Sequence, residues 1–136
     1  MSSETEIKDK LKYGIAATLS GQFAEDPRRF LEMLAKLLEK AIPHETQVVR
    51  TGGLFTMKSV KTVTVAVKGK RYAIEEVGGD TLHAERVKIA QGIALKTESI
   101  SIELWIAEIS PFLTERAKTD RIARNAIARV VKKTSV

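Results

Sequence analysis

The sequence of 136 residues contains no cysteine, and only 5% of its residues are aromatic. Without cysteine the chain can form no disulfide and offers neither a thiolate nucleophile nor a cysteine-ligated zinc site. No uninterrupted apolar run approaches the ~20 residues that span a bilayer. The first ten residues, MSSETEIKDK, lack the apolar stretch of a secretory signal. We therefore expect a cytoplasmic protein with no membrane insertion.

Motifs for catalysis and for phosphate binding are also missing. The sequence has no G-x-S-x-G elbow, and the patterns G-x-x-x-x-G-K-[ST] and G-x-G-x-x-G do not occur. Glu75 and Glu76 are neighbours on a predicted strand, so they face opposite sides and cannot act as a paired acid and base. We expect no catalytic residues, no cofactor and no enzymatic activity, and we keep a small enzyme of unknown chemistry as the second alternative function.

The chain has two histidines, His44 and His83. His83 and Glu85 point to the same side of a predicted strand, and Asp80 lies in the turn before it, so the three side chains could together ligate a divalent metal. Such loosely spaced ligands arise easily by chance, and the His-x-Glu pair of zinc deaminases needs a downstream cysteine pair that is absent here. We therefore predict no metal site.

The stretch that indicates its structure most plainly is 62–74, TVTVAVKGKRYAI. Val63, Val65 and Val67 alternate with smaller or polar residues, which is typical of a strand with one buried face. Gly69 can adopt the positive φ that a tight hairpin requires, and Tyr72 and Ile74 resume the alternation.

The same periodicity predicts an antiparallel sheet of four or five strands between residues 46 and 97. The expected strands are 46–50, 60–68, 70–77 and 81–88, and 93–97 is either a short fifth strand or a connection. Residues 54–57 either continue the first strand or form an exposed apolar loop. The apolar positions change parity between Leu82 and Val87, which suggests a bulge or an early end of the fourth strand.

Helical periodicity frames the sheet on both sides in sequence. We expect a first helix over 4–19 that ends near Gly21, a link over 21–25, and a second helix over 27–42 that begins with Asp26 as N-cap and Pro27 at the first helical position. Together these two helices would form a hairpin.

The last quarter of the chain predicts one long helix over 101–132, kinked or split near Pro111 because proline removes a hydrogen bond from the helix interior. The whole chain, 1–136, is then a single α+β domain with an N-terminal helical hairpin, a central antiparallel sheet and a long C-terminal helix. We expect the following residues to be buried together: Leu34, Leu37, Leu38, Val63, Val65, Val67, Tyr72, Ile74 and Trp105.

The net charge is +6, and the positive surplus lies in the sheet region and the last helix. Residues 46–100 hold nine Lys/Arg against five Asp/Glu, and residues 101–136 hold seven against four. This charge makes nucleic-acid binding the first alternative function, although we prefer ordinary solvated faces as its explanation, and basic residues also protect sheet edges from aggregation. The residues of this alternative are Lys58, Lys61, Lys68, Lys70, Arg71, Arg121 and Arg124.

The interpretation we prefer is a non-enzymatic protein-interaction module, adaptor or chaperone-like. Its partner is another protein or a second copy of the chain, and we expect a homodimer that associates through its helices. The first helix has a narrow apolar stripe, and the last helix carries more apolar surface than one sheet face needs. The predicted contact residues are Ile7, Leu11, Leu104, Trp105, Ile109, Phe112, Ile127 and Val130.

Overall fold

The computed structural model describes residues 4–52 and 58–134, with side chains described for 14–52 and 58–132. In chain order its elements are α1 (Glu4–Glu25), α2 (Pro27–Ala41), β1 (Thr46–Thr51), β2 (Ser59–Val67), β3 (Lys70–Gly78), β4 (Thr81–Ala90), β5 (Ile93–Ile100), α3 (Ile102–Thr119) and α4 (Arg121–Thr134). The strands form one antiparallel sheet in the order β1-β2-β3-β4-β5. The predicted α+β fold is confirmed. The alternatives for 54–57 lie outside the described residues.

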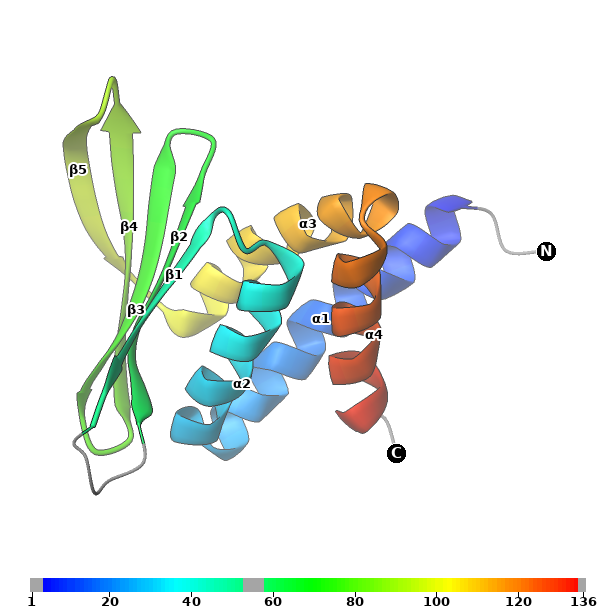
Figure 1. Ribbon diagram of the computed structural model, residues 1–136, viewed down its shortest axis with the longest axis horizontal. Coiled ribbons are helices and arrows are strands. Elements are labelled where there is room, and N and C mark those ends of the chain that lie inside the picture. The colour runs from blue at the N-terminus through cyan, green and yellow to red at the C-terminus, as the bar shows by residue number, and fades with distance from the viewer. Residues whose placement is uncertain (1–3, 53–57, 135–136) are drawn as a thin grey trace.

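The helices cover one face of the sheet in two layers (Figure 1). α2 contacts β1 and β2, and α3 contacts β4. α1 and α4 pack mainly on α2, α3 and each other. The second helical layer therefore needs apolar residues on its inner side only, and its outer side faces solvent.

The predicted core is confirmed at eight of its nine positions. Leu34, Leu38, Val63, Val65, Ile74 and Trp105 are fully buried, and Leu37 and Tyr72 are at most 4% exposed. Val67 is only half-buried and packs at the edge of the core, because it lies at the end of β2 beside the turn to β3. The alternation on β2 and β3 thus places one face of the sheet against α2 and α3.

The parity change on the fourth strand has a different origin from the one predicted. From Leu82 through Lys88, β4 pairs with β3 without a register shift, with Ala84 paired to Ile74 and Val87 paired to Arg71. Ala84 belongs to the main core, whereas Val87 is buried outside that cluster, since odd-numbered residues of this strand face away from the helices. A register shift does occur, but later, between Lys88 and Ile89.

The uncertain segment after β4 is a full strand, β5, of eight residues at one edge of the sheet. The segment is therefore a strand and not a connection, and it continues three residues beyond the predicted end at Thr97. All its residues from Ile93 to Thr97 are exposed, so this half of the strand has no buried face, and the alternation of Ile93 and Leu95 does not mark a side turned toward the core.

The first helix is longer than predicted and runs through Gly21 to Glu25. Gly21 is exposed, and a Cβ at this position would meet no other part of the protein. Close packing therefore does not require a glycine here. Beyond it, Phe23 packs edge-to-face on Phe30 of α2, with ring centroids 5.5 Å apart. This aromatic contact stabilises the last turn and outweighs the low helix propensity of one glycine.

The predicted helix is not split near Pro111, because α3 continues through Pro111 to Thr119, and the division into two helices lies at Asp120 instead. Pro111 and Ala107, whose carbonyl loses its helical partner, are both exposed and can reach water. On the buried side of the same helix, the hydroxyls of Ser110 and Thr114 donate to the carbonyls four residues earlier, at 2.6 and 3.0 Å. The helix therefore tolerates the proline, and the chain turns only at Asp120.

Each pair of consecutive helices is joined by one aspartate. Asp26 and Asp120 have extended backbones, and each backbone N–H donates to the carbonyl four residues before it. The Asp26 carboxylate accepts from the Arg29 N–H at 3.2 Å, and the Asp120 carboxylate accepts from the Ala123 N–H at 3.1 Å. One residue thus ends one helix and caps the next.

Replacing Asp120 by alanine should lower the free energy of unfolding by about 1 kcal/mol, because the first turn of α4 loses its cap. Urea denaturation followed by circular dichroism measures this loss. Asp120→Asn should retain most of the stability, because asparagine caps equally well. Thr119→Ala, at an exposed neighbouring position, should change stability by less than about 0.5 kcal/mol. Equal stability of the Asp120→Ala and Thr119→Ala variants would show that the cap contributes nothing.

Candidate binding surfaces

The structure buries several of the predicted contact residues within the chain itself. Trp105, Ile109 and Ile127 are at most 1% exposed, so their apolar surface is already covered by the core. Leu104 is 41% exposed, and Phe112 is half-buried with the Arg116 guanidinium 5.7 Å from its ring centre. Among the residues of α3 and α4, only part of the predicted surface therefore reaches solvent.

The remaining predicted contacts lie in α1 and α4. The side chains of Ile7 and Leu11 lie outside the described residues, although the backbone of both is in α1. Val130 of α4 is half-buried and lines a groove between α2 and α4.

The α2–α4 groove has a volume of about 930 Å³. Its walls are α2 and α4, and the C-terminal turn of α1 closes one end. Met33, Leu37, Ala126 and Val130 give it an apolar floor. The polar residues that line it are Gln22, Glu25, Asp26, Arg29, Glu32, Lys36, Lys40 and Arg129. An apolar floor with charged rims suits the apolar face of an amphipathic helix.

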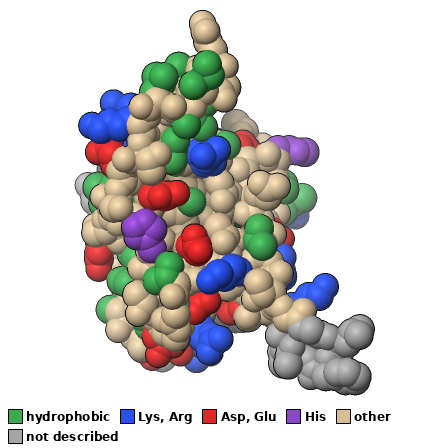
Figure 2. Space-filling view, turned by 90° about the vertical axis from the view of Figure 1, so that its left-hand side faces the viewer, with side chains coloured by type: hydrophobic (Ala, Val, Ile, Leu, Met, Phe, Trp, Pro, Cys, Tyr) green, Lys and Arg blue, Asp and Glu red, His purple; other side chains and the backbone are tan. Residues whose placement is uncertain are grey.

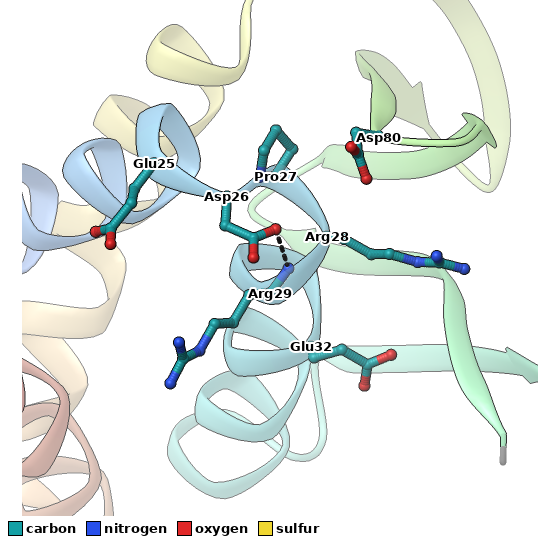
Figure 3. Close-up of a pocket in the computed structure, with 7 residues that line it drawn as sticks. All are labelled: Glu25, Asp26, Pro27, Arg28, Arg29, Glu32 and Asp80. Atoms are coloured by element: carbon teal, nitrogen blue, oxygen red, sulfur yellow. Dashed lines mark hydrogen bonds between the residues drawn. The ribbon is translucent and has the colours of Figure 1, made fainter.

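A smaller hollow of about 540 Å³ adjoins the groove at the junction of α1 and α2 (Figure 3). Figure 3 shows Asp80, from the turn between β3 and β4, on the far side of the hollow from Asp26 and Arg29. The residues that line it are Glu25, Asp26, Pro27, Arg28, Arg29, Glu32 and Asp80. Glu32 is already engaged, since its carboxylate accepts from the Val60 N–H at 2.8 Å and ties α2 to β2.

Metal ligands do not gather in these hollows or elsewhere in the described part of the chain, where no three His, Asp or Glu side chains are placed to hold an ion. His83 lies on β4 with its Nε2 3.8 Å from the Glu85 carboxylate. Asp80 lines the hollow beside α2 instead.

A charged network between α3 and the sheet is centred on Glu108. The Tyr72 hydroxyl donates to Glu108 Oε1 at 2.6 Å, and Arg86 Nη1 donates to Glu108 Oε2. Arg86 Nη2 also donates to Glu98 of β5, at 3.3 Å. The network thus links three strands to α3, and sequence reasoning did not detect it because its members are far apart in the chain.

The electrostatics of this network favour a charged arginine and a neutral tyrosine. Burial and then the hydrogen bond to Glu108 raise the pKa of Tyr72 to about 12. Burial opposes the charge on Arg86, but the carboxylates of Glu108 and Glu98 outweigh it and raise the pKa of the guanidinium.

The buried Nε atom of Arg86 and the buried Nε1 atom of Trp105 have no hydrogen-bond partner among the described residues. The network fastens α3 to the sheet through one glutamate.

The basic residues of the nucleic-acid alternative do not form one surface. Lys68, Lys70 and Arg71 lie together at the β2–β3 turn, whereas Lys58 precedes the opposite end of β2. Lys61 pairs with Glu76 of β3 at 3.5 Å.

The other two, Arg121 and Arg124, lie on α4, which packs on the other helices. Arg124 donates to the Ala117 carbonyl at 3.1 Å. The nucleic-acid alternative stays a prediction, with three of its seven residues adjacent.

The structure places further cations and apolar residues at the end of the sheet, where sequence reasoning had assigned no site. Lys88 and Lys96 pair with each other across β4 and β5, next to the exposed Ile93 and Leu95. A signal was present in the sequence, because Lys88 and Lys96 flank the turn residues Gln91 and Gly92 at nearly equal distances. For the α2–α4 groove no such signal exists, since its two walls come from opposite ends of the chain.

Comparison of the chain with protein-family models, with curated proteins and with solved structures finds no match. Among the described residues, no helix combines the length and the apolar character needed to cross a membrane.

Proposed function

We propose that the chain is a non-enzymatic protein-interaction module that self-associates through its helices, with the α2–α4 groove as the contact site. The observation that carries this proposal is the groove itself, which combines an apolar floor with charged rims on the helical side of the molecule. Grooves of this kind bind amphipathic helices through apolar residues spaced three or four apart.

A second copy of the chain can supply such a helix. The N-terminal end of α1 reaches beyond the other helices in Figure 1. Its sequence carries Ile7 and Leu11 four residues apart, among charged residues of both signs. The charged residues of this segment, of both signs, can pair with opposite charges at the rim of the groove. The rim carries carboxylates, such as Glu25 and Glu32, and cations, such as Lys40 and Arg129. The N-terminal half of α1 from one copy would then lie in the groove of its partner.

Replacing Met33 by glutamate should weaken dimerisation at least tenfold, because a charge would enter the apolar floor of the groove. Met33 is half-buried rather than fully buried, so the fold should persist. Sedimentation velocity over a concentration series gives the dimer dissociation constant, and far-UV circular dichroism checks the fold.

The matched control is Ile122→Glu, which adds the same charge to α4 at a position that is 67% exposed and does not line the groove. Its dissociation constant should stay within about twofold of the original chain, because the substituted side chain makes no contact at the interface. A protein that remains monomeric at high concentration would overturn self-association. Equal weakening by both variants would place the interface elsewhere.

A further inference from the structure

One end of the sheet extends beyond the helices that cover the rest of it (Figure 1). This sheet tip consists of the β2–β3 turn, 67–71, and the β4–β5 hairpin, 88–96. Both turns have two residues with positive φ: Lys68 and Gly69 in the first, Gln91 and Gly92 in the second. Such turns match the twist of the flanking strands and form tight, well-defined hairpins. The Ile89 N–H donates to the Gly69 carbonyl at 2.8 Å, so the two turns are joined.

The sheet tip exposes large aliphatic side chains. Ile93 is 64% exposed and Leu95 is 66% exposed, and both lie on β5 at the edge of the sheet. Figure 2 shows hydrophobic side chains gathered at this end of the sheet, where the hairpin turns. Isolated exposed apolar residues are ordinary, but here they share one protruding hairpin.

Cations surround these apolar residues. Lys70, Lys88 and Lys96 are paired in register across β3, β4 and β5, so three like charges lie side by side on neighbouring strands. This arrangement is unfavourable for the sheet by itself. Lys96 lies 3.9 Å from Glu98. Among the described residues, no salt bridge joins a carboxylate to the other cations of the tip, which are Lys68, Lys70, Arg71 and Lys88. An external anion bound beside Lys70, Lys88 and Lys96 would reduce the repulsion among them.

The combination of a protruding shape, aliphatic residues and unpaired cations selects among possible partners. Proteins that bind single-stranded nucleic acid combine aromatic stacking with a groove that follows the backbone. The sheet tip instead protrudes and exposes the aliphatic residues Ile93 and Leu95, so it suits such a strand poorly. Pairing of the β5 edges of two copies would centre near Lys96 and bring like charges together. The register shift between Lys88 and Ile89 also makes the β4–β5 ladder irregular near this edge. A bilayer accepts a protruding apolar tip, and anionic headgroups supply the missing charge.

We propose that the sheet tip docks onto an anionic lipid bilayer. Ile93 and Leu95 enter the headgroup region, and the lysines around them contact the lipid phosphates and carboxylates. The contact is peripheral, since the hairpin is far too short to cross the hydrocarbon layer. This surface lies on the sheet, away from the α2–α4 groove, so the proposal does not depend on self-association.

Vesicle co-sedimentation of the full chain tests the proposal. The probes are vesicles of pure phosphatidylcholine and vesicles with 30% phosphatidylserine, both at about 0.1 M salt. The chain should bind the anionic vesicles at least tenfold more tightly than the neutral ones, and added salt should weaken that binding. Lys88→Gln with Lys96→Gln, and separately Ile93→Ser with Leu95→Ser, should each reduce binding by about tenfold or more.

Matched controls move the same changes to other surfaces. Lys58→Gln with Lys132→Gln removes two exposed lysines elsewhere, and Ile122→Ser removes an exposed isoleucine from α4. Both controls should bind within about twofold of the original chain, because neither alters the tip. All substituted residues are exposed, and circular dichroism verifies that each variant is folded.

Three results would each overturn the proposal. They are absence of binding to the anionic vesicles, equal binding to neutral and anionic vesicles, and equal loss in the tip variants and the controls. If vesicle binding is absent and salt-sensitive binding to a single-stranded oligonucleotide survives Ile93→Ser with Leu95→Ser, the cations serve nucleic acid instead.

Discussion

Replacing Trp105 by alanine should lower the free energy of unfolding by about 3–5 kcal/mol. Trp105 is fully buried between α3 and the sheet, and its ring stacks edge-to-face on Tyr72 with the centroids 6.3 Å apart. Its removal leaves a large cavity that the neighbouring strands and helices cannot fill. Equilibrium urea denaturation measures the loss, which is a large part of the stability of a domain of this size.

The neighbouring residue provides the control for this experiment. Leu104 is 41% exposed on the same turn of α3, so Leu104→Ala should cost less than about 1 kcal/mol. Trp105→Phe should cost less than Trp105→Ala, because the buried indole Nε1 has no hydrogen-bond partner among the described residues that would be lost. A loss below about 1 kcal/mol for Trp105→Ala would mean that α3 is not packed on the sheet as described.

The network around Glu108 predicts that the chain loses stability at alkaline pH. The pKa of Tyr72 is raised to about 12 in the folded chain, and an unfolded tyrosine titrates near 10. The folded state therefore retains the phenolic proton more tightly. Its contribution to stability is fully present below pH 10 and is lost as the pH rises from 10 to 12. The loss amounts to about 2–3 kcal/mol at most.

Tyr72→Phe isolates this effect, because it has no phenolic proton and all other titrating groups stay in place. Between pH 9 and 12 the original chain should lose about 2–3 kcal/mol more stability than the variant. Absorbance at 295 nm should show one tyrosine ionising near pH 12 in the original chain and not in Tyr72→Phe. Parallel stability curves for the two proteins would contradict the raised pKa of Tyr72, and with it the burial of this side chain beside Glu108.

Sequence patterns predicted the parts of the fold in which local chemistry and packing agree. Asp26 and Pro27 begin α2 as their capping preferences require, and the alternation of Val63 and Val65 identifies the buried face of the sheet. In these places propensity, periodicity and burial point to the same structure.

The errors arise where tertiary contacts override a local signal. Gly21 does not end α1, because Phe23 beyond it packs on Phe30. Pro111 does not break α3, because it lies on the exposed side of the helix. Asp120, which does end that helix, is an ordinary polar residue in sequence, and its role depends on the backbone turn that it caps.

Candidate sites were harder to predict than the fold, because they depend on residues that only the tertiary structure brings together. Apolar periodicity in α3 and α4 correctly indicated packing faces, but it could not show that Trp105, Ile109 and Ile127 are covered by the chain itself. The α2–α4 groove combines Met33 with Val130, which are almost a hundred residues apart. Charge counts likewise gave the sign of the surface without placing Lys88 beside Lys96.

The most direct test of the proposed self-association is cross-linking between copies of the chain. A photoreactive methionine analogue at Met33 places the cross-linker in the groove, and equal amounts of ¹⁴N- and ¹⁵N-labelled chain distinguish contacts within one copy from contacts between two. We expect cross-links from Met33 to residues 4–13 that join light and heavy peptides. Cross-links confined to single copies, or a protein that is monomeric throughout the same concentration range, would contradict the proposed function.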